Sequence, residues 1–397
     1  MLKPNSFAAL ALLTAVVAFQ PLSTDMYLPA LPEMARHFAT DAGGMQLTLS
    51  VFIAGFACAQ LVYGPLSDRF GRRPVLIAGA AVFLLASLAC ALAQTIEGLV
   101  LARFAQAVGA CAGPVLSRAV VRDVFDRAMA ARAMAYIGSA TALAPLVAPV
   151  LGGHMTVWWG WPSIFHALAV LAALLLAGVV LLLPETNAHR DPHALNPGRL
   201  AANYLALFRS REYLGFLVTT AVAFAGLFTF ISGSSFVLID FLGVATDRFG
   251  YFFAMVVAGF MSGAFLAGRI TLRLGIERMV LLGGACVMAG GGTQAALAWA
   301  GVNHPAAVMA PMMAYTCGIG LLVPNATAGA VSVFPRQAGV ASAMVGFVQM
   351  ATAALASLLL GQFHDGTQIP MTNMIGLCGT GGFLCAYLLV WRRGGPS

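Results

Sequence analysis

Asp25 and Arg103 are charged residues that each stand inside a long apolar stretch of the sequence. A charge in membrane hydrocarbon is costly, so such residues usually face a cavity or a partner and serve function. Because burial disfavours the charged form of a carboxyl group, Asp25 could take up and release a proton. Arg103, at a similar predicted depth, could pair with it. Two plainer alternatives are that Asp25 is solvated at a helix end, and that the pair is permanent and structural.

A second group of charged residues lies between residues 64 and 74. Four of these eleven residues are charged, although charged residues make up only 9% of the chain. Two apolar runs flank it, so it is predicted to be a turn at the membrane surface. Gly64 and Gly71 favour a tight reversal there. Pro74 suits the first turn of the helix that follows.

Asp68 is an acid that orientation in the membrane does not require, which favours a role in a cytoplasmic gate. Its candidate partners are Arg118 and the helix N-terminus near Gly339, since helix N-termini attract anions. The neighbouring arginines could share this role or only fix the topology. The predicted gate comprises Gly64, Asp68, Arg69, Gly71, Arg72, Arg73 and Arg118.

The composition is that of a membrane protein, because 60% of the residues are hydrophobic against about 45–50% in soluble proteins. A spanning helix needs about 20 mostly apolar residues. Twelve such runs are predicted, at 7–29, 46–64, 74–94, 98–120, 133–156, 162–183, 213–236, 249–271, 278–300, 305–326, 338–361 and 370–391.

The basic residues predict the orientation, since cytoplasmic loops carry an excess of Lys and Arg. With both termini cytoplasmic, 18 basic residues lie inside and two, Arg36 and Arg248, lie outside. The inner set is Lys3, Arg69, Arg72, Arg73, Arg118, Arg122, Arg127, Arg132, Arg190, Arg199, Arg209, Arg211, Arg269, Arg273, Arg278, Arg336, Arg392 and Arg393. We therefore expect a multi-pass membrane protein with both termini in the cytoplasm.

Several classes of function find no support in the sequence. The net charge of +7 comes from arginine clusters between apolar runs, which argues against a nucleic-acid partner. The seven cysteines show no zinc or redox spacing, and the histidines show no metal spacing. A nucleotide-binding loop of the Gly-x-x-x-x-Gly-Lys-Ser/Thr kind is absent, and clustered catalytic groups are absent too. We predict no metal, no cofactor and no enzyme.

An internal repeat divides the chain. Residues 268–275 match Gly64, Arg69 and Gly71 of the group at residues 64–74, and residues 333–336 match residues 124–127. We predict an N-terminal half at 1–183, a linker at 184–212 and a C-terminal half at 213–397. Within the linker, Leu200, Tyr204, Leu207 and Phe208 recur at helical spacing, which predicts an amphipathic helix on the inner leaflet or else a plain linker. Such repeats place the substrate site between the halves near mid-membrane.

These features identify a resemblance. Residues 64–74 resemble the signature that the major facilitator superfamily carries between helices 2 and 3, and 268–275 resemble its decayed copy. Residues 23–32, Ser-Thr-Asp-Met-Tyr-Leu-Pro-Ala-Leu-Pro, resemble the bicyclomycin-resistance (Bcr/CflA) branch of drug:proton antiporters, as do residues 231–237. The resemblance implies an all-α polytopic membrane protein with twelve transmembrane helices in two six-helix pseudo-symmetric halves. Relatives carry an acid at the place of Asp25.

Two further segments resemble motifs of that family. Residues 103–109, Arg-Phe-Ala-Gln-Ala-Val-Gly, resemble its helix 4 motif Arg-x-x-Gln-Gly-x-Gly, with Ala at 107 where Gly is usual. Residues 144–153 resemble the helix 5 antiporter motif through Pro145, Pro149, Gly152 and Gly153. Prolines bend a helix and small residues allow close helix packing. The motif is associated with exporters.

The resemblance implies a proton-coupled exporter of small apolar or aromatic drug-like molecules, monomeric and driven by the proton gradient. Its cavity wall could include Tyr27, Gln106, Phe224, Phe228, Asn325 and Gln349, although such side chains often face lipid or packed core. One alternative is a proton-coupled metabolite or sugar transporter, because Asp25 serves either direction. An alternative of another class is a non-transporting membrane sensor, which would not need Asp25 or Asp68.

Overall fold

The computed structural model describes residues 6–188 and 190–392, and this part of the chain contains helices and no strands. Twelve of its helices, some of them interrupted, are long and apolar enough to cross a membrane. All twelve predicted spans are therefore confirmed. Lys3 and Arg393, which belong to the basic residues counted above, lie outside the described residues.

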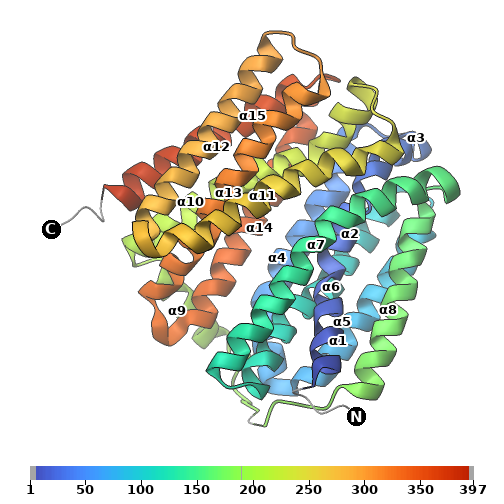
Figure 1. Cartoon of the computed structure of the whole chain (residues 1–397). Coiled ribbons are helices and arrows are strands. Elements are labelled where there is room, and N and C mark those ends of the chain that lie inside the picture. The colour runs from blue at the N-terminus through green and yellow to red at the C-terminus, as the bar shows by residue number, and fades with distance from the viewer. Residues whose placement is uncertain (1–5, 189, 393–397) are drawn as a thin grey trace.

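The first half of the molecule carries six spans that group together, blue to green in Figure 1. Its first span is interrupted and its other five are single helices. The elements are α1 (Phe7–Val17), α2 (Phe19–Asp25), η1 (Leu28–Ala30), α3 (Leu31–His37), α4 (Ala42–Phe70), α5 (Arg72–Ala91), α6 (Ile96–Val124), α7 (Arg127–Trp159) and α8 (Pro162–Leu182).

The second half, yellow to red in Figure 1, packs against the first. Two of its spans end in a π-helical turn. The elements are α10 (Arg211–Ser235), η2 (Phe236–Phe241), α11 (Thr246–Leu274), α12 (Ile276–Trp299), α13 (Pro305–Val333), η3 (Pro335–Gln337), α14 (Ala338–Gln362), α15 (Ile369–Cys385) and η4 (Ala386–Trp391). In the sequence, the linker between the two halves contains one further helix, α9 (Pro197–Leu207).

Prolines interrupt the first span, which the sequence had predicted as one continuous helix. Pro29 has no N–H, so the carbonyl of Asp25 lacks its helical donor, and Pro32 does the same to the carbonyl of Leu28. The chain forms the short η1 there. The carbonyl of Leu28 accepts the backbone N–H of Leu31 within this turn and a further hydrogen bond from Ser235 Oγ of α10, at 2.6 Å. This carbonyl thus links the two halves.

The internal repeat is visible in how helices are joined. Gly71, with φ of 105°, is the single residue between α4 and α5, and Gly275, with φ of 83°, stands in the same place between α11 and α12. Only glycine adopts such angles readily. Gly64 lies within α4 and makes no reversal, contrary to the prediction, because α4 remains helical until Phe70.

Glu185 holds this turn from the side of the linker. Its carboxylate accepts hydrogen bonds from the backbone N–H groups of Arg72 at 2.9 Å and Arg73 at 3.2 Å, which are the first residues of α5. Asn187 donates to the carbonyls of Ser67 and Asp68, both at 3.2 Å. The start of the linker is therefore fastened to residues 64–74.

We expect Glu185→Ala to lower the free energy of unfolding by about 1 kcal/mol, the usual cost of losing a helix N-terminal cap. Equilibrium unfolding in mixtures of dodecyl sulfate and dodecyl maltoside would measure it. Glu185→Gln keeps a side-chain acceptor and should lose less. An alanine variant as stable as the wild type would show that these hydrogen bonds add nothing.

The predicted amphipathic helix exists as α9, but part of its apolar face is covered by protein. Leu207 is fully buried, and Tyr204 lies half-buried with its hydroxyl 3.4 Å from the carbonyl of Leu61 in α4. Burial raises the pKa of the Tyr204 hydroxyl. The side chains of Arg199 and Leu200 lie outside what the structure describes. Contact of α9 with the inner leaflet remains a prediction.

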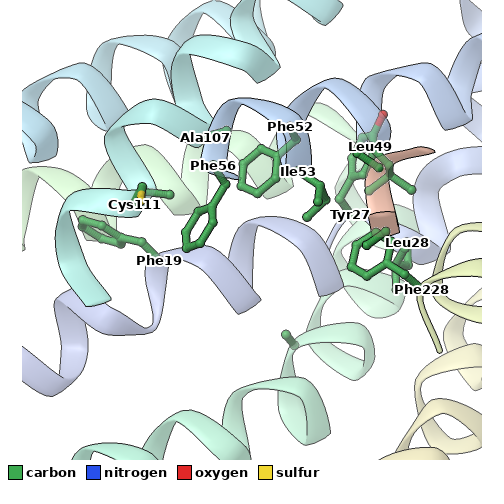
Figure 2. Packing of buried hydrophobic residues seen from close by; sticks show 14 of the residues in the cluster. Phe19, Tyr27, Leu28, Leu49, Phe52, Ile53, Phe56, Ala107, Cys111 and Phe228 are labelled. Atoms are coloured by element: carbon green, nitrogen blue, oxygen red, sulfur yellow. The ribbon is translucent and has the colours of Figure 1, made fainter. Parts of the chain in front are cut away.

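Aromatic side chains fill the interior of the first half. Phe19 stacks on Phe83 with ring centroids 4.2 Å apart. Figure 2 shows Phe52 and Phe56 of α4 pointing toward the broken first span, which carries Phe19 and Tyr27. This packing fixes the position of the first span and therefore of Asp25.

Candidate functional site: a cavity between the two halves

The two halves meet closely at one end of the bundle, here called the outer end, which carries Pro29 and Gly160. The opposite end, with Gly71 and Gly275, is called the inner end. At the outer end, a Cβ on Gly153 of α7 would lie 2.6 Å from the carbonyl of Thr246 in α11, and a Cβ on Gly250 of α11 would overlap the backbone nitrogen of Val150 in α7. Glycine at these two positions therefore permits the close approach of the two halves. Gly152 packs against the carbonyl of Met26 within the first half.

An ion pair also joins the halves at the outer end. Arg36 of α3 lies 3.4 Å from Asp240 of η2, and both side chains are largely exposed. Exposed pairs typically contribute less than about 1 kcal/mol. The close packing of α7 against α11 at Gly153, not this pair, therefore dominates the closure.

A cavity of about 260 Å³ lies between the halves and is called the central cavity. Helices of both halves contribute to it, namely α1, α2, α4, α6 and α7 from the first and α13 and α14 from the second. Its lining consists of Val17, Gln20, Phe56, Gln60, Pro114, Arg118, Thr141, Thr327, Ser342, Val345, Gly346, Gln349 and Met350. This placement agrees with the site expected from the repeat.

A second cavity of about 390 Å³, the inner pocket, lies toward the inner end. It shares Gln60, Arg118 and Ser342 with the central cavity. Its lining also includes Asp68 and Arg72 of the predicted gate and Tyr204 of α9. The central cavity therefore continues toward the inner end, while the halves are in contact at the outer end.

Arg103 is fully buried in the first half and is held by rings and amides. Its guanidinium lies 4.5 Å from the ring centroid of Tyr27 and 4.3 Å from that of Phe52, within the range of a cation–π interaction. Its Nη1 donates to the carbonyl of Ser23 at 3.1 Å and to Gln106 Oε1 at 2.6 Å. Two of its nitrogens, Nε and Nη2, have no hydrogen-bond partner.

Asp25 is the last residue of α2 and is only 6% exposed. The ion pair with Arg103 that the sequence suggested is absent: among the described residues, the salt bridges are Arg36–Asp240, Arg72–Asp68 and Arg72–Asp123. The guanidinium of Arg103 is taken up by the Ser23 carbonyl, by Gln106 and by the rings of Tyr27 and Phe52 instead. Similar depth along two helices was therefore not sufficient to bring the two charged groups together.

The predicted gate residues form a network within the first half. Arg72 donates to Asp68 at 2.5 Å, to Asp123 of α6 at 3.0 Å and to Ser67 Oγ at 2.6 Å. Asp68 therefore pairs with Arg72 and not with either predicted partner. Arg69 is exposed beside Phe70, and Arg73 donates to the carbonyl of Val180 at 2.6 Å.

Of the six residues predicted for the cavity wall, Gln349 lines the central cavity. Tyr27 and Gln106 are fully buried and bonded elsewhere, the tyrosine hydroxyl to Thr48 Oγ1 at 2.6 Å. Asn325 Oδ1 accepts from Thr271 at 3.0 Å, which joins α13 to α11. Phe224 and Phe228 lie together, 6.3 Å apart. Contact of these five residues with a substrate remains a prediction.

The fifth membrane span is α7, and the two prolines of the helix 5 motif, Pro145 and Pro149, lie inside it. Pro145 removes the helical donor of the Thr141 carbonyl, and Thr141 lines the central cavity. Pro149 does the same to the carbonyl of Pro145, one turn closer to Gly152 and Gly153. A weakened stretch of backbone thus connects the cavity to the outer closure.

Sequence reasoning missed most of the polar lining. Gln20, Gln60, Thr141, Thr327 and Ser342 line the central cavity, and none had been singled out. Uncharged polar residues are common at helix contacts, so their type alone gave no signal. A search for Gln residues within spans would have found Gln20 and Gln60.

Comparisons with known proteins agree with this architecture. Residues 13–392 match the Major Facilitator Superfamily. The chain is 31% identical over 390 residues to the "Bicyclomycin resistance protein homolog" of Haemophilus influenzae, covering 98% of each chain. It is 29% identical to "Multidrug resistance protein D" of Escherichia coli K12, covering 95% of each. The structure of a D-xylose–proton symporter superposes with a TM-score of 0.75 at 15% identity, covering 98% of this chain and 99% of that one.

The fold and the cavity define a twelve-helix membrane transporter rather than an enzyme. The chain belongs to the Major Facilitator Superfamily. Its similarity to resistance proteins is consistent with the bicyclomycin-resistance branch that residues 23–32 suggested.

Proposed function

We propose that this protein exports small drug-like molecules across a bacterial inner membrane in exchange for protons. The printed names of its relatives, which refer to bicyclomycin and multidrug resistance, support drugs as substrates. The arginine distribution supports cytoplasmic termini, so that the inner pocket faces the cytoplasm. The protein works as a monomer, since one chain contains both halves of the cavity.

The observation that carries the proposal is a cavity shared by both halves and sealed by α7 at one end. Rocking of the halves would open the outer end and close the inner end. The network of Asp68, Arg72 and Asp123 lines the inner pocket. It is placed to meet the second half when that end closes.

Asp25 is the residue proposed to carry the proton. Its carboxyl group makes no hydrogen bond or ion pair with any described residue. An unpaired acid away from water is neutralised by binding a proton. It lies five residues, or about 7.5 Å of helix rise, beyond Gln20 of the central cavity. Opening of the outer end would hydrate Asp25 and exchange its proton with the outside.

Arg103 has a supporting role in this proposal. Its positive charge is fixed beside the carbonyl of Ser23, two residues from Asp25. It would stabilise the ionised carboxylate in the state that has released its proton. Its two unpartnered nitrogens, Nε and Nη2, could donate hydrogen bonds to that carboxylate.

Inside-out membrane vesicles that contain the protein test this function. Energised with lactate, they should accumulate labelled bicyclomycin, and nigericin, which collapses the pH gradient, should release it. Accumulation that survives nigericin would contradict proton coupling. Failure to transport any of a broad drug panel would contradict drug export and favour a metabolite as the substrate.

A further inference from the structure

The central cavity has a mixed polar and apolar lining with a single charged side chain among its described residues, that of Arg118. Three glutamines and three hydroxyl side chains share the wall with it, beside apolar residues such as Val17 and Met350. Among the described residues that line this cavity, none is a carboxylate and only Phe56 is aromatic. The wall therefore combines hydrogen-bonding groups with one positive charge.

The charge of Arg118 is not neutralised by the protein. It has no hydrogen bond and no ion pair to any residue that the structure describes. Three acids line the inner pocket with it: Asp68 and Asp123, which are both bound by Arg72, and Asp191, which makes no ion pair with Arg118. Arg122, a residue of the same sign, also lines that pocket.

Two amide groups beside Arg118 also lack partners. Gln349 of α14 is 9% exposed, and its Nε2 is buried without a hydrogen bond. Gln60 of α4 has a buried Oε1 that also lacks a hydrogen-bond partner, and its amide group packs against Gly346. Buried polar groups in proteins are normally paired. These groups come from opposite halves, so one molecule between them could satisfy both.

We propose that the central cavity recognises a carboxylate or another strong hydrogen-bond acceptor of the substrate, and that it rejects lipophilic cations. Arg118 contacts the acceptor, because a guanidinium offers several N–H donors in a planar fork that matches a carboxylate. Gln349 Nε2 adds a donor from the other half. A cation would meet an uncompensated positive charge away from bulk water, where repulsion is strong. The inference rests on the proposed function, since it assigns the substrate class of that cavity.

Binding to detergent-purified protein tests the inference without requiring transport. The probes are nalidixate, a carboxylate; chloramphenicol, which is neutral and rich in acceptors; and tetraphenylphosphonium, a lipophilic cation. Calorimetry should show binding of the first two and weaker binding of the cation. Arg118→Gln should weaken nalidixate binding about tenfold or more, as expected for loss of a charged hydrogen bond. Arg118→Lys keeps the charge and should lose less.

A matched control separates this effect from a general loss of positive charge. Arg273 is exposed at the end of α11 and lines neither cavity. Arg273→Gln should bind all three probes as the wild type does. Gln349→Leu should weaken nalidixate and chloramphenicol together, because it removes a donor and not a charge.

Three results would overturn the inference: tetraphenylphosphonium binding as tightly as nalidixate, unchanged nalidixate affinity in Arg118→Gln, or no binding of either acceptor probe to protein with a cooperative thermal transition. Failure of the proposed function looks different. Selective binding without proton-linked transport would contradict the function alone. Proton-linked transport of tetraphenylphosphonium would contradict the inference alone.

Discussion

Asp25→Asn is expected to abolish proton release on drug binding while the protein still folds and binds drug. Asparagine has nearly the shape of aspartate but binds no proton in this range of pH. In weakly buffered detergent solution, adding bicyclomycin to the wild type should acidify the medium as the drug displaces the proton. The asparagine variant should give no change. Export in inside-out vesicles should fall to the level of vesicles that lack the protein.

The same competition predicts a pH dependence of drug affinity. If one proton leaves when drug binds, the apparent Kd of the wild type should fall as pH rises, by at most about tenfold per pH unit. The dependence should vanish in Asp25→Asn. Glu97→Gln is the matched control, because Glu97 is an exposed acid at the outer end of α6 and lines neither cavity. Proton release that persists in Asp25→Asn would assign the proton to another group.

Gly153→Ala is expected to open the outer end of the molecule. A methyl group there would lie 2.6 Å from the carbonyl of Thr246 in the second half, which is backbone and cannot turn aside. Overpacking of this kind costs about 1–3 kcal/mol, which shifts a two-state equilibrium roughly 5- to 150-fold. Because the clash exists only while the outer end is closed, the outward-open state gains. Export should slow, since each cycle passes through the closed arrangement.

Accessibility of one cysteine measures this shift. Thr24 is 2% exposed and lies just inside the closure. In a background without the seven native cysteines, Thr24→Cys should react with an impermeant maleimide faster when Gly153→Ala is present. Gly138→Ala is the control on the same helix, because a Cβ there has no neighbour within 4 Å. Equal labelling rates in the two alanine variants would contradict the role of Gly153.

The spans could be predicted because membrane thickness imposes a length on each apolar run. The ends of the helices could not be predicted in this way, because a helix can continue beyond the hydrocarbon layer of the membrane. The fourth predicted span ended at residue 120, but α6 continues to Val124. The second was predicted to end at residue 64, but α4 remains helical to Phe70, where the positive φ of Gly71 turns the chain. Polar residues can extend a helix into water without any change in hydropathy.

The site was predicted in part. Depth along a helix follows from residue counting, which placed Asp25 and Arg103 at similar levels. Rotation about the helix axis depends on packing, and prolines in the first span alter it further. The ring pair around Arg103, Tyr27 and Phe52, comes from two different helices. Such a contact depends on tertiary structure that no sequence spacing encodes.

The lining of the central cavity was predicted only in part. Gln349 had been proposed for the wall and lies there, whereas the aromatic residues proposed with it, Tyr27, Phe224 and Phe228, are not among the described residues that line the cavity. Arg118 was predicted to bind Asp68, and both residues line the inner pocket. Arg72 binds Asp68 instead, because only the turn at Gly71 separates the end of α4, which carries Asp68, from the start of α5, which carries Arg72.

Proton movement driven by drug alone tests the central claim most directly. Purified protein would be placed in liposomes that contain the pH-sensitive dye pyranine, with equal pH on both sides. Adding bicyclomycin outside should raise the internal pH, because each drug molecule that enters sends protons out, whichever way the protein is inserted. Liposomes with Asp25→Asn should show no change. Drug entry without a pH change, or with internal acidification, would contradict drug:proton exchange.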